Sequence, residues 1–294
     1  GTSGRSGFEA ALLWYWNIAE NRDATITPKI FTKRGVQLEL CLAHLRALNP
    51  ALRIWGLSAT LGNLEQARDV LLGPNRAGRL VKGPAQKPVS IDSLLPDTIE
   101  RFSWSGHLGL ALLDPVIACL EKAGTTLLFT NTRSQAEMLF QNLWTINEDG
   151  LAIALHHGSI EQELRVWVEE ALHKGILTAV VCTSSLDLGV DFRPVETVFQ
   201  VGSPKGVARF LQRAGRSGHQ PGAESNIWFL PTHTLELLEA AALKDAVTDS
   251  FIESKQPFLL CFDVLIQFMG TLAISEGFYP DELFDVMRAT YCYR

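Results

Sequence analysis

The sequence predicts an α/β fold in which a parallel sheet carries helices on both faces. Between residues 126 and 230, short apolar runs typical of buried strands alternate with longer stretches whose apolar residues recur at helical spacing. Polar motifs stand directly after several of these runs. Because parallel sheets hold their ligands at the carboxyl ends of the strands, these motifs are the candidate site.

Length and composition limit the class of protein. A chain of 294 residues with 47% hydrophobic and 20% charged residues is long enough for two domains, or for one with two partial ones. The net charge of −6 argues against a strongly basic nucleic-acid coat protein. The five cysteines include no C-x-x-C pair, so neither a zinc site nor a disulfide framework is indicated. No apolar run approaches the ~18 residues of a membrane span, and we expect a cytoplasmic protein without membrane contact.

The N-terminal third is irregular. Residues 1–31 show no clear period, and we leave them unassigned, with foreign or frameshifted sequence as one interpretation. The elements expected next are a buried helix over 35–48, a strand over 52–57, and a helix over 64–72 that Asn63 caps and Gly73 ends. Residues 74–98 hold four prolines and little periodicity, so they predict an interdomain linker.

The rest of the chain divides into a sheet domain over 99–232 and a helical unit over 233–294. The expected strands are 126–130, 151–155, 178–182, 196–201 and 226–230, and the helices between them are 134–144, 161–173 and 205–214. The helical unit is expected to contain helices over 233–247, 263–274 and 281–288. Because its strand–helix pattern is self-contained, we expect 99–232 to fold by itself. Residues 32–73 should be poorly ordered unless they dock on it.

The most informative motif is Q-R-x-G-R-x-G-H, residues 212–219. Arg213 and Arg216, three positions apart, are expected on one face of a helix, where they can converge on one target. Guanidinium groups match phosphate oxygens, and such a pair can stabilise charge on a transferring γ-phosphoryl group. Gly215 between them allows another backbone or a nucleotide to come close. The plain alternative is an exposed helix end with two solvated arginines.

Two other turns suit phosphate groups of nucleic acid. In F-T-N-T-R-S, residues 129–134, the hydroxyl of Thr130, the side chain of Arg133 and the amides of the following helix are available, with Ser134 as the expected N-cap. In T-S-S-L-D-L-G-V-D, residues 183–191, Thr183 and Ser184 can hold a phosphate.

The remaining candidates come from the same and neighbouring turns. Gly189 permits an unusual backbone angle, and Asp191 can accept a hydrogen bond from a ribose hydroxyl or reach the arginines. Ser58 and Thr60 of L-S-A-T can link a nucleotide pocket to a neighbouring domain, although a simple Ser/Thr turn is the favoured interpretation of that motif alone. His156-His157-Gly158 lacks further metal ligands, so Gly158 is taken as a backbone-contact position and no metal site is predicted.

In this order the motifs resemble motifs III to VI of superfamily 2 helicases, and most of all the large helicase-related (Lhr-like) family with its ligase-associated DEXH-box branch. The segments that carry the resemblance are 33–40, 56–63, 184–191 and 202–206. The resemblance implies that 99–232 is the second RecA-like domain. It also implies that 32–73 is the C-terminal remnant of the first RecA-like domain, and that 233–294 is the start of a winged-helix domain.

The resemblance further implies an ATP- and Mg²⁺-dependent 3′-to-5′ translocase of DNA repair. Its DNA would be single-stranded or 3′-tailed, and repair proteins such as a DNA ligase would be partners. By the same resemblance Arg213 and Arg216, with Gln212 beside them, contact the γ-phosphate. Asp191 and Gly189 lie at the nucleotide, and Thr130 and Thr183 face the DNA backbone. Ser58 and Thr60 couple hydrolysis to strand movement.

The sequence departs from that family at the phosphate loop and the acidic box. Neither G-x-x-x-x-G-K-[ST] nor a D-E-x-H box occurs in these 294 residues, and no carboxylate stands just before Lys33 where the resemblance places the box. We therefore expect this chain alone not to hydrolyse ATP. The alternative function is a non-catalytic RecA-like module that binds DNA or protein. An acidic chain without a basic stripe has little electrostatic affinity for DNA in that role.

Overall fold

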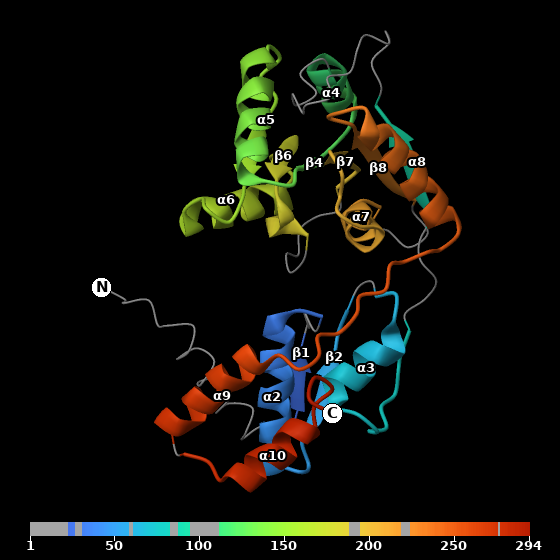
Figure 1. The fold of residues 1–294 in the computed structure, drawn as a ribbon. Helices are drawn as coiled ribbons and strands as arrows, with labels where there is room; N and C mark the ends of the chain where they lie inside the picture. The colour runs from blue at the N-terminus through green and yellow to red at the C-terminus, as the bar shows by residue number, and fades with distance from the viewer. Residues whose placement is uncertain are drawn as a thin grey trace. The chain divides into compact units, whose positions relative to one another are not determined.

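The computed structural model describes residues 23–26, 31–58, 61–82, 88–94, 112–187, 195–218, 224–275 and 277–294. The chain divides into two compact units (Figure 1). We call Pro84–Glu253 the sheet unit, and Gly1–Gly83 with Ser254–Arg294 the split unit. Within the described residues, no helix has the length and apolar character needed to cross a membrane.

The sheet unit contains a six-stranded, entirely parallel sheet with the order β3-β8-β7-β4-β6-β5. Its strands are β3 Val89–Ser93, β4 Thr126–Phe129, β5 Ile153–His156, β6 Ala179–Cys182, β7 Thr197–Val201 and β8 Ser225–Leu230. All four residues of β4 and of β6 are buried. Such continuous apolar strands are expected where helices cover both faces of a parallel sheet, and this confirms the predicted fold class.

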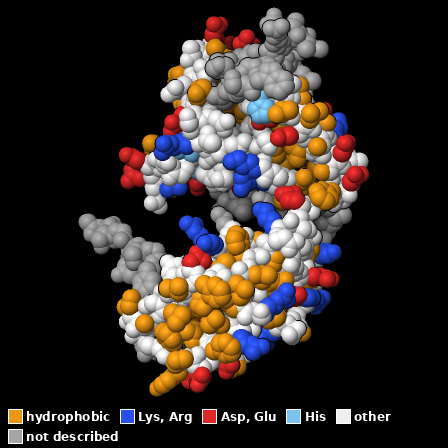
Figure 2. Space-filling model, in the orientation of Figure 1, with side chains coloured by type: hydrophobic (Ala, Val, Ile, Leu, Met, Phe, Trp, Pro, Cys, Tyr) orange, Lys and Arg blue, Asp and Glu red, His pale blue; other side chains and the backbone are white. Residues whose placement is uncertain are grey.

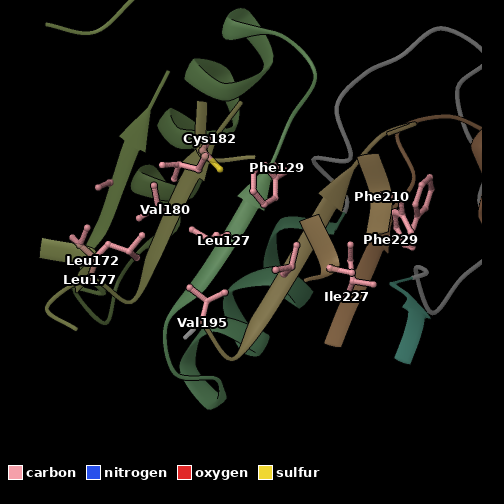
Figure 3. Packing of buried hydrophobic residues seen from close by; sticks show 14 of the residues in the cluster. Leu127, Phe129, Leu172, Leu177, Val180, Cys182, Val195, Phe210, Ile227 and Phe229 are labelled. Atoms are coloured by element: carbon pink, nitrogen blue, oxygen red, sulfur yellow. The ribbon is translucent and has the colours of Figure 1, made fainter. Parts of the chain in front are cut away.

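Helices cover the two faces of the sheet. They are α4 Leu113–Lys122, α5 Arg133–Ile146, α6 Gln162–His173, α7 Val207–Ala214 and α8 Leu235–Thr248, with a short 3₁₀ helix η2 at Ser184–Leu186. Buried side chains of α6, α7 and α8 share one core with Phe129, Val180 and Phe229 of the sheet (Figure 3). Side chains of α4 and α5 form the core on the other face, with Leu128 and Phe199. Strand–helix alternation, read from the sequence, therefore predicts both layers.

The structure differs from the sequence expectation at both ends of this unit. Strand β3 lies inside the predicted linker 74–98 and pairs with β8, from Val89 opposite Ser225 to Ser93 opposite Phe229. Its V-S-I-D-S pattern is short, and of its residues only Ile91 is buried, so the periodicity is weak in sequence. Helix α8, expected in the helical unit after residue 232, instead contributes Ala240 and Leu243 to the core beside the sheet.

The split unit combines two segments that are far apart in sequence. Its elements are β1 Asp23–Ile26, α2 Lys33–Leu48, β2 Arg53–Gly56, α3 Leu64–Leu72, α9 Phe262–Ile274 and α10 Pro280–Arg288. Strands β1 and β2 pair in parallel, so part of the unassigned segment 1–31 forms a strand. Figure 2 shows hydrophobic side chains at the surface of this unit. The exposed large apolar residues near α9 are Phe258, Leu259, Leu260, Phe262, Ile266 and Ile274.

Helix α2 owes its order to the C-terminal helices. Val36 and Leu40 of α2 pack against Val264 and Phe268 of α9 in one apolar cluster. The expectation that 32–73 would be poorly ordered unless it docked on the sheet domain did not include this cover from α9. A helix that is apolar nearly all round needs cover on more than one side. Residues more than 200 positions later supply that cover, and local sequence does not reveal it.

A buried carboxylate fastens α2 to the end of the chain. Glu39 is only 4% exposed, and its Oε2 accepts hydrogen bonds from the backbone amides of Tyr291 and Cys292, both at 3.0 Å. Its other carboxylate oxygen, Oε1, has no partner among the described residues. Burial raises the pKa of Glu39 to about 7, against the lowering effect of the two amides.

The raised pKa predicts that the split unit loses stability as pH rises. The folded state holds a proton on Glu39 up to about pH 7, whereas the unfolded chain releases it near 4.5. Stability should be highest below pH 4.5 with respect to this group and fall between 4.5 and 7, by on the order of 2–3 kcal/mol. Hydrogen exchange at the Tyr291 and Cys292 amides, measured from pH 5 to pH 8 and corrected for intrinsic rates, reports it. Glu39→Gln should remove the dependence, and an equal dependence in that variant would refute the assignment.

Candidate functional site

The carboxyl edge of the sheet collects the polar motifs. Strands β4, β5, β6 and β7 are parallel, so the turns that follow them open on the same edge. The turn after β4 leads into α5, and the turn after β6 forms η2. The turn after β7 leads into α7, which carries Arg213. The prediction that the polar turns share one edge therefore agrees with the described topology.

Asp187 lies at the centre of an arginine cluster at this edge. Its Oδ1 accepts a hydrogen bond from Nε of Arg213 at 2.9 Å, and its Oδ2 lies 3.7 Å from Nε of Arg209. Its backbone carbonyl accepts from Nη2 of Arg216 at 2.8 Å. One buried carboxylate thus stands among three guanidinium groups, which leaves the cluster with a surplus of positive charge. Neither Asp187 nor Arg209 is among the site residues predicted from the sequence. The signal that was available is the acidic residue a few positions after a buried strand.

Arg213 is enclosed by the protein. The side chain is 1% exposed, and its Nη1 donates to Oε1 of Gln200 at 2.6 Å. Gln200, at the end of β7, is also fully buried and donates through Nε2 to the carbonyl of Gly202 at 2.8 Å. The guanidinium carbon of Arg213 lies 4.7 Å from the ring centre of Phe129. A guanidinium held in this way does not face a ligand, which differs from the expectation that it converges with Arg216 on one target.

Arg216 occupies a different environment. Helix α7 ends at Ala214 and Gly215 is its C-cap, so Arg216 lies beyond the helix and not on the same face as Arg213. The side chain is half-buried, and its Nε has no hydrogen-bond partner among the described residues. Burial lowers the pKa of Arg216, and the charge of Asp187 opposes that effect. Gln212, also half-buried, precedes these residues in α7. Arg216 is therefore the less enclosed of the two motif arginines.

A second glycine of the motif is the one that the backbone requires. Gly215 has an ordinary φ of −63°, whereas Gly218 has φ +66°. A Cβ atom at Gly218 would lie 2.4 Å from the backbone oxygen of Glu224. A close backbone approach within this motif thus occurs at Gly218, and its partner is the chain entering β8.

The turn after β4 divides into buried and exposed parts. Thr130 is fully buried, and its hydroxyl lies 3.3 Å from the carbonyl of Cys182 and 3.2 Å from the carbonyl of Thr132. This differs from the expectation that its hydroxyl faces the DNA backbone. The N-cap of α5 is Thr132 rather than Ser134, since its hydroxyl accepts from the amide of Gln135 at 3.2 Å. Arg133 is exposed, and its Nη1 donates to Ser159 Oγ at 3.2 Å, which joins the turns after β4 and β5.

The turns after β5 and β6 are joined by a core histidine. His156 is 1% exposed, with Nδ1 2.8 Å from Ser185 Oγ and Nε2 3.1 Å from Glu169 Oε1. Burial lowers the pKa of His156, although Glu169 opposes the shift. At the surface of these turns Gly158 and Ser184 are exposed and Thr183 is half-buried. No group of three potential metal ligands occurs within the residues that the structure describes.

The other candidates lie elsewhere. Thr60, Gly189 and Asp191 fall outside the described residues. Ser58 is exposed and follows β2 in the split unit.

Two protein families match the chain. Residues 110–220 match the helicase conserved C-terminal domain, and residues 245–294 match the winged helix domain of the large helicase-related protein. The first match contains the whole arginine cluster. The second begins in α8 and includes α9 and α10.

Known helicases resemble the chain over most of its length. ATP-dependent helicase Lhr-Core of Methanothermobacter thermautotrophicus is 35% identical over 269 residues, which is 89% of this chain and 31% of that protein. Lhr helicase/uracil glycosylase of Escherichia coli is 31% identical, over 87% of this chain and 20% of that protein. The structure of Mycobacterium smegmatis helicase Lhr bound to ssDNA and AMP-PNP matches with a TM-score of 0.83 and 32% identity, over 94% of this chain and 37% of that one. This chain thus spans a third or less of the curated relatives named here.

The enclosed position of Arg213 predicts a large loss of stability on truncation. Arg213→Ala leaves the Asp187 carboxylate and the Gln200 amide oxygen without their buried partner, and removing one member of a buried ion pair costs about 3–5 kcal/mol. Arg209→Ala, at an exposed ion pair, should cost less than about 1 kcal/mol. Urea unfolding of both variants measures the difference, and equal costs would show that the buried network does not hold the edge together.

The two glycines Gly218 and Gly150 separate backbone strain from crowding. Both have positive φ, +66° and +68°, but a Cβ at Gly150 meets no atom within 4 Å. Gly150→Ala should therefore cost only the strain of about 1 kcal/mol. Gly218→Ala should cost clearly more, because the backbone of Glu224 must also move. Thermal unfolding of the two variants tests this, and similar melting temperatures would contradict the close contact.

Proposed function

The chain belongs to the large helicase-related (Lhr-like) group of superfamily 2 helicases, and we propose that its sheet unit contributes the arginine residues of the nucleotide site in an ATP-dependent DNA translocase. The observation that carries this proposal is the half-buried side chain of Arg216, whose Nε is itself buried and has no hydrogen-bond partner among the described residues. It stands in a cluster where Arg209 and Arg213 share the single carboxylate of Asp187. A guanidinium group with N–H donors that lack a partner, in a cluster with more cations than carboxylates, is suited to bind phosphate oxygens.

The two motif arginines have separate roles in this proposal. Arg216 contacts the terminal phosphate of ATP, where charge develops when the phosphoryl group is transferred. Arg213 is a positioning residue, because it holds Asp187, whose carbonyl in turn holds Arg216. ATP, when bound, supplies the free energy of its terminal phosphate bond. We propose that Gly189 and Asp191 lie near the nucleotide, as the family resemblance implies.

The described residues do not fit a magnesium site. They contain no cluster of three acidic or other ligand side chains, and the sequence has no acidic box. Mg²⁺ binds through carboxylates and substrate phosphates, so its protein ligands would have to come from outside these residues. The phosphate loop is absent from the sequence as well, and we therefore expect no ATP hydrolysis by this chain alone.

The exposed polar groups at the same edge are proposed to contact a DNA strand. Arg133, Gly158, Thr183 and Ser184 follow β4, β5 and β6, which are the neighbouring strands at one end of the sheet. An arginine, hydroxyls and backbone amides bind sugar–phosphate without reading sequence. Thr130 is left out of this set, because its hydroxyl is occupied inside the protein. Single-stranded or 3′-tailed DNA, movement in the 3′-to-5′ direction, and a role in repair with a DNA ligase as partner are proposed from the family resemblance alone.

Two fluorescent ligands test the proposal on the intact chain. A labelled non-hydrolysable ATP analogue should bind weakly, and Arg216→Gln should reduce its affinity about tenfold, the loss of one charge-assisted phosphate contact. Arg53→Gln, an exposed arginine on β2, is the matched control and should change nothing. A labelled single-stranded oligonucleotide at low salt should bind more weakly to Arg133→Gln and equally to Arg53→Gln.

Each outcome has a distinct meaning. Analogue binding that Arg216→Gln does not change would refute the role of that arginine. Binding of DNA without any binding of the analogue would favour the alternative, a non-catalytic RecA-like module that binds DNA. If neither ligand bound, the nucleotide and DNA roles would both be wrong for this chain.

A further inference from the structure

The arginine helix α7 lacks an N-cap of its own. The N-cap position is Gly206, which has no side chain to offer, and the first turn contains no acidic residue. The exposed amides of a helix N-terminus need acceptors, and its positive dipole end favours an anion. Glu253, which lies 45 positions after Ala208, provides both the hydrogen-bond acceptor and the negative charge. The amide of Ala208 donates to its two carboxylate oxygens at 3.1 and 3.3 Å.

The contact depends on the glycine at position 206. Gly206 has φ +128°, and a Cβ atom there would lie 2.3 Å from Oε1 of Glu253. Glycine is therefore required twice, by the backbone angle and by the carboxylate that occupies the space of a side chain.

A tight helix end carries Glu253 to this place. Helix α8 is followed by Ser250, which has φ +54°. The amide of Phe251 donates to the carbonyl of Ala246 at 2.8 Å, and the amide of Ser250 donates to the carbonyl of Val247 at 3.1 Å. This is the pattern of a Schellman ending, with serine where glycine is usual. Glu253 is the last residue of the sheet unit, and the chain continues from there into the segment that forms α9.

A second carboxylate holds the other end of the same loop. Glu236, near the start of α8 and 5% exposed, accepts from the amide of Ser203 at 2.9 Å and from the amide and hydroxyl of Thr232. The loop before α7 is thus held at Ser203 by Glu236 and at Ala208 by Glu253. Two residues with positive φ, Lys205 and Gly206, lie between these anchors, and a third, Gly202, directly precedes the first anchor. The position of α7 is therefore set by α8 and its C-terminal extension.

We propose that Glu253, as the cap of α7, is a positioning residue for the phosphate-facing arginine. Helix α7 has only eight residues, too few to be stable by itself, so its order depends on its ends and its packing. Arg213 lies in the last turn of this helix, and Arg216 lies two residues beyond its last residue, Ala214. When Glu253 leaves the N-terminus of α7, the helix loosens and Arg216 loses its fixed place. This inference rests on the proposed nucleotide role of Arg216 only in its functional part.

Hydrogen exchange tests the structural part independently of any nucleotide. In Glu253→Ala the amides of residues 207–210 should exchange about fivefold faster, the loss that an N-cap deletion causes. Glu253→Gln keeps an acceptor oxygen and should restore most of the protection. Glu239→Ala, an exposed glutamate on α8, is the matched control and should leave these amides unchanged. Unchanged exchange in Glu253→Ala would overturn the proposal.

A variant cycle and the ATP analogue test the coupling. Gly206→Ala expels the carboxylate by collision, so adding Glu253→Ala to it should cause no further increase in exchange, and additive effects would refute the direct contact. Glu253→Ala should also reduce the affinity for the ATP analogue severalfold, and Glu253→Gln should retain most of that affinity. One outcome is that the wild-type chain and Glu253→Ala bind the analogue equally well, although α7 exchanges faster in the variant. That outcome would refute the claim that Glu253 positions Arg216 for the nucleotide. If the unchanged chain does not bind it, the proposed function fails and the exchange result still decides the capping role.

Discussion

The buried contact between Arg213 and Asp187 is the interaction on which the sheet unit's functional edge depends. It joins the end of α7 to the turn after β6, and through Gln200 and the ring of Phe129 it reaches the ends of β7 and β4. An ion pair removed from water is stable only when its remaining donors and acceptors are satisfied. Here Gln200 accepts from Nη1 of Arg213, and the ring of Phe129 lies against the guanidinium group. The same arrangement places the carbonyl of Asp187 where Nη2 of Arg216 donates to it, so a stability contact also helps to determine the position of this half-buried arginine.

Sequence patterns predict the frame of this edge well, because the frame depends on local periodicity. The apolar runs that form β4 and β6 and the glycine that follows Ala214 are visible in sequence. What sequence does not reveal is which polar side chain of a motif is buried. Thr130 and Arg133 stand three positions apart in one motif, yet one hydroxyl lies inside and the other side chain is exposed. Thr130 directly follows β4, whereas Arg133 is the first residue of α5, so the two side chains belong to different local structures.

Non-local contacts explain the other differences. Strand β3 is held by pairing with β8, more than 130 residues later, rather than by its own weak alternation. Helix α2 is covered by α9, and the Glu39 carboxylate binds amides of residues 291 and 292. The cap of α7 comes from residue 253. In each case local sequence contains half of an interaction, and the partner lies so far along the chain that no spacing rule connects the two.

Net charge is a poor guide to what this edge can bind. The chain carries −6 overall, yet several of its carboxylates near the site are already occupied. Glu236 and Glu253 accept backbone amides at the loop before α7, and Asp187 is shared by guanidinium groups. Carboxylates bound in this way stabilise the chain's own cations and amides, and they leave Arg216 with an unpartnered Nε among the described residues. The affinity of such a site for phosphate depends on this local surplus rather than on the sum over the chain, because screening confines exposed charges to about 8–10 Å in physiological salt.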